Sequence, residues 1–273
     1  MTRGHQRGRT SLRIGVVLVG AIVLAALVGT AWTPYPPDRP DFAVQLVAPS
    51  ATHPLGTDAF GRDLASRVLA GASLSLRVGL GAVAIGLLLG APIGLAAGWQ
   101  GGWMDDVTMR LIEVLYAFPA LLMALLLSAV YSPGTATAMA AIGLAFVPIF
   151  ARIARASALS SRSSPHLEAG RAVGAGWWRL GTRYLLPDAA GPLVVQASSS
   201  VSLALLAEAA LSYLGLGSPP DAPSWGVMLR EAQSFLGLSP WPALAPGAAI
   251  VLAVLGWSLL GDGLRDLLDP RTR

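Results

Sequence analysis

The chain lacks two residue types completely. Its 273 residues include no cysteine and no lysine, so all 19 basic residues are arginine. The absence of cysteine excludes disulfides, thiolate metal sites and thiol nucleophiles. The absence of lysine excludes a phosphate-binding loop of the kind that needs one, so this chain is not expected to hydrolyse ATP itself.

Charge of either sign is also scarce. Only 12% of the residues are charged and 54% are hydrophobic, whereas soluble domains carry about 25% charged residues. The apolar residues are gathered into long stretches, which indicates membrane-spanning helices. The net charge of +4 is not read as a nucleic-acid signal, because most arginines lie beside apolar stretches, where they fix membrane orientation.

Six stretches have the length and composition of spans, so we predict an all-α membrane protein with six transmembrane helices. The first stretch follows four arginines but is too long for the apolar part of a secretory signal, and we expect it to be retained. We expect residues 1–75 to form a tail, the first span and an outer segment, and residues 76–273 to form a core domain with five spans. The predicted spans are Ile14 to Trp32, Val78 to Gly98, Leu111 to Tyr131, Thr135 to Phe150, Pro192 to Leu216 and Ala243 to Leu260.

The distribution of arginine predicts the orientation. With a cytoplasmic N-terminus, 14 of the 19 arginines fall on the inner side, as positive charge is retained there. We therefore expect a multi-pass protein of the cell membrane with both termini in the cytoplasm.

The second predicted span carries glycine at every fourth position. Gly86, Gly90, Gly94 and Gly98 would line one helix face and let another backbone approach closely. We favour helix packing over a role in a pore for this face.

The loop between the fourth and fifth predicted spans indicates a helix, an elbow and a second helix. Ser164 and Pro165 form a helix-start signal, and Gly174 suits the left-handed conformation that ends a helix. A second helical piece from Trp177 is expected to end at Pro187. Such an elbow cannot bury its apolar residues by itself, so a partner groove or lipid headgroups should cover Leu167, Val173, Trp177, Trp178 and Tyr184.

This loop resembles the signature of binding-protein-dependent permeases of ATP-binding cassette importers. The matching residues are Glu168, Ala169, Gly170, Gly174, Leu186 and Pro187. Gly170 stands where the family usually has a second alanine, and Tyr184 stands where it usually has an aliphatic residue. In that family the elbow is a coupling helix that sits in a cleft of the ATPase subunit, and Glu168 is accordingly expected to contact the ATPase or hold the elbow's shape.

The resemblance runs from about Thr52 to the end of the chain. Before the second span, the stretch from His53 to Arg67 is similar to the dipeptide, oligopeptide and nickel branch, and so are segments near Trp103, Phe118, Leu211 and Trp225. The tail from Gly261 through Asp269, Pro270 and Arg271 is also similar. The layout resembles the second of the two paired permeases.

The resemblance implies the remaining parts of a transporter. The chain would form the path with a homologous second permease, bind two cytoplasmic ATPase subunits and receive substrate from an extracytoplasmic binding protein. ATP and Mg²⁺ would be held by the ATPases, and this chain would bind no cofactor. The cargo would be a dipeptide, a longer peptide, a nickel complex or another small solute.

Glu208 is the candidate polar site inside the membrane. An ionisable group in a span should face protein or a water-filled path, and we weigh a structural hydrogen bond slightly above contact with substrate. Glu113 and Arg110 are read as an interfacial pair without a transport role. Asp58, Arg62, Asp63 and Arg67 suit either surface ion pairs or contact with a docking protein.

No histidine has an acidic or histidine partner at metal-ligand spacing, so no metal site is predicted. Two rival functions are an ion-coupled secondary transporter, supported only by Glu208, and a membrane scaffold for which the elbow is a docking site. No internal repeat favours the first, and ATPase-dependent transport would exclude the second.

Overall fold

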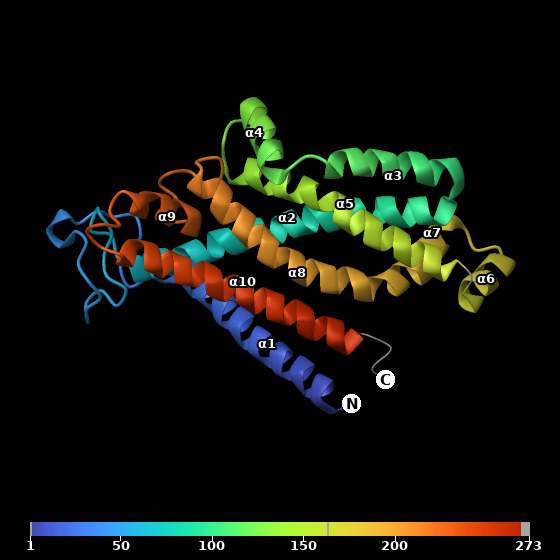
Figure 1. The fold of residues 1–273 in the computed structure, drawn as a ribbon, viewed down its shortest axis with the longest axis horizontal. Coiled ribbons are helices and arrows are strands. Elements are labelled where there is room, and N and C mark those ends of the chain that lie inside the picture. The colour runs from blue at the N-terminus through green and yellow to red at the C-terminus, as the bar shows by residue number, and fades with distance from the viewer. Residues whose placement is uncertain (1, 163, 269–273) are drawn as a thin grey trace.

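A computed structural model describes residues 2–162 and 164–268 of the chain, and within these residues every regular element is a helix. The resemblance at Asp269, Pro270 and Arg271 lies outside the described residues. Figure 1 shows long helices packed side by side, with short helices at both ends of the bundle. The α-helices are α1 (Thr2–Ala31), α2 (Leu64–Gln100), α3 (Gly102–Tyr116), α4 (Ala120–Tyr131), α5 (Thr135–Ser161), α6 (Pro165–Ala172), α7 (Trp177–Leu180), α8 (Leu186–Tyr213), α9 (Trp225–Gln233) and α10 (Trp241–Leu268).

Five helical stretches are long and apolar enough to cross a membrane, or six if α3 and α4 together count as one span. The expected span Leu111 to Tyr131 is not a single helix, since α3 and α4 meet at an angle of 84°. Pro119 explains the break, because a proline disfavours helical conformation in the residue before it and supplies no backbone donor. Its ψ of 141° is extended, and α4 starts at the next residue.

The glycine face of α2 packs against α5, as predicted. A Cβ atom on Gly86 would lie 2.6 Å from Phe146 Cβ, and one on Gly98 would lie 2.8 Å from the Arg155 carbonyl oxygen. Real Cβ contacts are essentially never that short, so a larger residue would force the two helices apart. Close backbone approach of this kind is what glycine stripes provide in membrane proteins.

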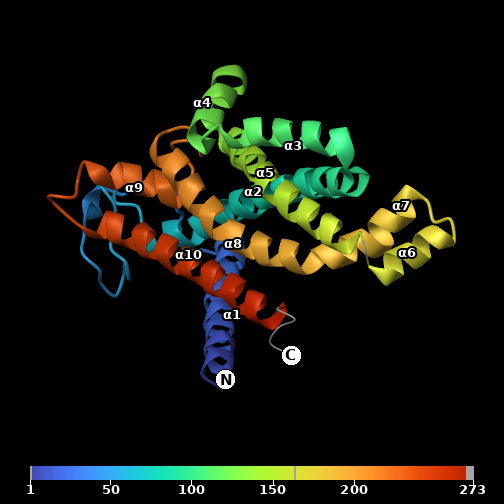
Figure 2. The same cartoon turned by 45° about the vertical axis from the view of Figure 1, so that its right-hand side comes forward.

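The two ends of the bundle differ in what they carry. The start of α1 and the end of α10 lie on the same side as α6 and α7, while the segment of residues 33–63 and α9 lie at the opposite side (Figure 1). The view in Figure 2 shows the same separation, with α6 and α7 projecting beyond the long helices. The predicted division at residue 75 falls inside α2, which crosses it without a break.

Candidate functional site

The elbow between α5 and α8 begins where the sequence signals placed it. The Ser164 hydroxyl donates to the Ser161 carbonyl oxygen at 2.6 Å, and the Glu168 amide donates to the Ser164 carbonyl oxygen at 3.1 Å. Glu168 lies in the first turn of α6 and is exposed. Gly174 has a φ of +72°, so the expected left-handed end of the helix is confirmed.

Gly170 and Tyr184, the two positions that depart from the family pattern, lie in contact. Gly170 is buried, and a Cβ placed on it would lie 2.9 Å from Leu180 Cδ2 and 3.4 Å from Tyr184 Cζ. A methyl group at position 170 would therefore press on Leu180, while it would only reach ordinary contact distance from the Tyr184 ring. Glycine at this position keeps α6 packed on the second half of the elbow.

The second half of the elbow does not end at Pro187, and that expectation is wrong. Residues Gly181–Leu185 form a π-helical turn that joins α7 to α8, and the Leu186 amide donates to the Gly181 carbonyl oxygen. Pro187 lies in the first turn of α8, where its missing N–H leaves no bond unmade. The wider π turn absorbs the proline, as such turns do inside helices. The elbow is therefore continuous with the next span. The whole stretch Trp177–Tyr213 is one helical segment that is long and apolar enough to cross a membrane.

The elbow buries some of its apolar residues and exposes others. Leu167 is fully buried and Tyr184 packs against the core, so the expectation that both need a partner is wrong. The packing of α6 on α7 supplies the cover that sequence reasoning did not foresee. Val173 and Trp178 remain 82% and 76% exposed. Together with Glu168 they form the surface that projects beyond the bundle.

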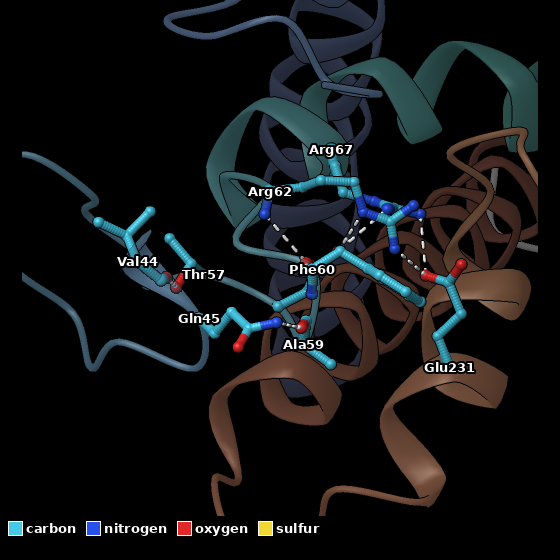
Figure 3. Close-up of polar contacts among 9 residues, drawn as sticks. Val44, Gln45, Thr57, Ala59, Phe60, Arg62, Arg67 and Glu231 are labelled. Atoms are coloured by element: carbon cyan, nitrogen blue, oxygen red, sulfur yellow. Dashed lines mark hydrogen bonds and ion pairs between the residues drawn. The ribbon is translucent and has the colours of Figure 1, made fainter. Parts of the chain in front are cut away.

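At the opposite end, two buried arginines and two carboxylates form a closed cluster. Arg62 Nε lies 2.6 Å from Asp58 Oδ2, and Arg67 Nη1 lies 3.0 Å from the same oxygen. The guanidinium groups of both arginines also donate to Glu231 Oε2, at 2.7 and 3.0 Å. Figure 3 shows Glu231 reaching from α9 to Arg62 and Arg67 at the start of α2. The cluster thus ties α9 to the segment that enters the second long helix.

Neighbouring contacts shape the loop that carries this cluster. The Gln45 side chain donates to the Ala59 carbonyl oxygen at 2.8 Å, and Thr57 donates to the Val44 carbonyl oxygen (Figure 3). Burial raises the pKa of Glu231 above the ordinary glutamate value, although Arg62 acts in the opposite direction. Charges buried together must be paired to be tolerated, and the four residues here carry two charges of each sign.

Glu208 lies within α8, outside both the elbow and the charged cluster at the opposite end. One carboxylate oxygen accepts from Ser75 of α2 at 3.0 Å, and the other accepts from Ser212 at 2.8 Å and Ser218 at 3.4 Å. The side chain is 1% exposed. The arrangement agrees with the structural interpretation, since these hydroxyls join α2, α8 and the loop after α8 and fill the acceptor positions of the carboxylate.

Comparison with known proteins decides the family. Residues 90–273 match the binding-protein-dependent transport system inner membrane component family. The chain belongs to this family. The match includes the permease's elbow, Glu208 and α9. It begins inside α2, after Asp58, Arg62 and Arg67 of the charged cluster.

Relatives over nearly the full length of the permease agree. It is 38% identical to the dipeptide transport system permease protein DppC of Alkalihalophilus pseudofirmus over 95% of this chain and 86% of that protein. It is 42% identical to a putative peptide transport system permease of Brucella suis over 97% of this chain and 89% of that protein. The glutathione transport system permease GsiD of Pectobacterium atrosepticum is 40% identical over 82% of this chain and 75% of that protein.

A solved structure supports the fold. An inward-facing conformation of the MetNI methionine ABC transporter matches with a TM-score of 0.61 at 17% identity, covering 74% of this chain and 96% of that one. The family and these relatives make the permease a transporter subunit and not itself an enzyme.

The structure unites some of the predicted site residues of the permease and separates others. Glu168, Ala169, Gly170 and Gly174 share the first half of the elbow, while Tyr184, Leu186 and Pro187 follow in its second half and at the start of α8. Glu208 belongs to neither half. Glu231 was missed, because nothing in the sequence links a glutamate on α9 to arginines 164 and 169 positions earlier.

Proposed function

We propose that this permease carries short peptides across the cell membrane together with a homologous second permease. The relatives named for dipeptides, peptides and glutathione support this substrate class. Six spans, with α3 and α4 forming the third, complete the proposed topology. Both termini and the elbow lie in the cytoplasm, and the segment 33–63 and α9 face the extracytoplasmic binding protein.

The elbow is the proposed contact with two ATPase subunits, which hold ATP and Mg²⁺. The observation that carries this assignment is the exposure of Val173 and Trp178 on a short helical projection beside the exposed Glu168. Exposed aromatic groups of this kind are typical anchors of protein interfaces. Because the π turn joins the elbow to α8 without a break, a shift of the docked elbow would tilt that span directly and open the path to the other side.

The test is co-purification of the wild-type permease and Glu168→Arg with the partner permease and the ATPases. Glu168 is exposed in the first helical turn, so charge reversal should leave the fold intact while opposing the helix dipole and the docking surface. We expect loss of about tenfold or more of the bound ATPase, since interface anchors contribute about 2 kcal/mol or more. The partner permease should remain bound.

Asp221→Arg is the matched control, because it reverses an exposed carboxylate at the opposite end of the molecule. It should retain the ATPases. If the two variants retain equally little bound ATPase, the elbow is not the specific ATPase contact. If the wild type binds no ATPase at all, the importer assignment fails and ion-coupled transport becomes the function to test.

A further inference from the structure

Helix α3 presents three distinct faces. Successive residues are about 100° apart around a helix, so positions three and four apart share a face. One face packs on α5 through Met109, Ile112 and Leu115. A second face exposes large apolar side chains, Val107, Leu111 and Val114. The third face exposes charged side chains, Asp106, Arg110 and Glu113.

The charged face is held beside α5 by a partly buried ion pair. Arg155 donates to Asp105 through two nitrogens, Nε to Oδ1 and Nη2 to Oδ2, both at 2.6 Å. This two-point contact fixes the rotation of α3 about its own axis. One turn earlier on α5, the Arg152 guanidinium lies over the Tyr116 ring, 4.0 Å from its centroid.

A cavity of about 530 Å³ lies between these helices. Its lining includes Asp106, Arg110, Glu113 and Arg152, together with Arg155, which is already paired with Asp105. Apart from that pair, two carboxylates and two guanidinium groups face one space. Arg110 and Glu113 both lie within the described part of the chain and no ion pair joins them there, so the expected interfacial pair is not formed. These charges are therefore available to a ligand.

Lipid hydrocarbon is an unfavourable environment for this face. Leu111 and Val114, 67% and 61% exposed, lie at the same depth along α3 as Arg110 and Glu113. Hydrocarbon suits the apolar pair, whereas charged side chains in lipid are strongly disfavoured. At this depth α3 must have lipid on one side and water or protein on the other.

We propose that the charged face of α3, together with Arg152 of α5, lines the water-filled inner part of the transport path and binds zwitterionic solutes. Asp106 and Glu113 suit a ligand's ammonium group, and Arg110 and Arg152 suit its carboxylate, which guanidinium groups recognise well. Two charges of each sign in a space of this size match a short peptide with free ends. The inference rests on the proposed function and assigns residues to its path.

Because the chain contains no cysteine, a single introduced cysteine is the one thiol available for labelling in each variant. Single variants Asp106→Cys, Arg110→Cys and Glu113→Cys are compared with Val107→Cys, Leu111→Cys and Val114→Cys, each in the nucleotide-free importer complex in lipid nanodiscs. A membrane-impermeant maleimide should label the first set about tenfold faster or more, because the thiolate reacts and lipid disfavours it. Equal rates on the two faces would overturn the assignment to the path.

Met109→Cys then tests the ligand, because this position lines the cavity and leaves all four charges in place. Alanyl-alanine at millimolar concentration should slow its labelling, whereas the acetylated, amidated dipeptide should not. Adding Arg152→Gln or Glu113→Gln to Met109→Cys should abolish that protection. Equal protection by both compounds, or by neither, would overturn the zwitterion site.

The same complex separates this inference from the proposed function. If the unmodified chain supports ATP-driven peptide uptake but Met109→Cys shows no selective protection, the inference fails and the importer assignment stands. If the unmodified chain neither binds ATPases nor supports uptake, the proposed function fails, whichever face of α3 labels faster.

Discussion

The two ends of the permease differ in how they hold their charged groups. At the end that carries α9, Asp58, Arg62 and Arg67 are buried, and both arginines are paired with Asp58 and Glu231 inside the chain. At the end that carries the elbow, Trp178 and Glu168 are exposed. The first end therefore pairs its buried charges inside the chain, whereas the elbow carries an exposed carboxylate and exposed apolar surface of the kind that marks an interaction site.

This difference predicts where variants should harm folding and where they should harm assembly. Removing one member of a buried charge cluster leaves an uncompensated charge, which is strongly destabilising. Changing an exposed side chain that has no buried neighbours leaves folding nearly unchanged. The ends can therefore be told apart by measuring stability and subunit binding on the same variants.

The largest expected effect comes from Arg67→Ala. Arg67 is fully buried and bridges Asp58 and Glu231, so its loss leaves these two carboxylates with Arg62 but without their second guanidinium group. We expect a loss of stability of about 3 to 5 kcal/mol, seen as a collapse of the monodisperse peak in detergent and a lowered Tm. Arg179→Ala, at an exposed position of the elbow, should leave both unchanged. Similar Tm values for the two variants would remove the contrast between the ends.

A smaller loss of stability is expected from substituting Glu208, a buried and hydrogen-bonded group within α8. Glu208→Ala removes the acceptor of the Ser75, Ser212 and Ser218 hydroxyls and should cost about 1 to 3 kcal/mol, the range for a buried polar group left unsatisfied. Glu208→Gln can still bond to these hydroxyls, which serve as donors or acceptors, so its Tm should stay close to that of the wild type.

ATP-driven uptake by Glu208→Gln distinguishes a structural glutamate from a transporting one. Because the amide preserves the bonds without the ionisable proton, uptake should persist. Loss of uptake at normal Tm would show that the carboxylate itself takes part in transport and would revive ion coupling as a mechanism.

Much of this architecture could be predicted from local signals. Apolar stretches of membrane length locate the long helices, the spacing of Gly86 to Gly98 predicts the close approach of another helix, and Gly174 predicts the end of α6. Each of these depends on residues close together in the chain. Pro119 and Pro187 mark the limits of such reasoning, because a proline can either break a helix, as between α3 and α4, or lie in a first turn, as in α8.

The site could be predicted only where its parts are near in sequence. The elbow's residues fall within one short loop, so their grouping was foreseen. The burial of Leu167 and the pairing of Glu231 depend on contacts that no local pattern encodes. The charged face of α3 lies between these cases: its spacing is visible in the sequence, but its separation from lipid follows only from the packing of α3 on α5.

The smallest expected effect is a pH dependence at the outer cluster. Burial raises the pKa of Glu231 above its ordinary value of 4.5, while Arg62 and Arg230 lower it and Asp58 raises it further. The folded state therefore takes up this proton at a higher pH than the unfolded state does. The resulting stabilisation is fully present below the ordinary value and is lost as pH rises through the raised pKa.

The Tm of the wild type, compared with that of Glu231→Gln, should accordingly rise as pH falls through this acidic window. Glu231→Gln cannot titrate, so parallel Tm curves for the two proteins would show that Arg62 and Arg67 outweigh burial and keep the carboxylate charged, as at an exposed site.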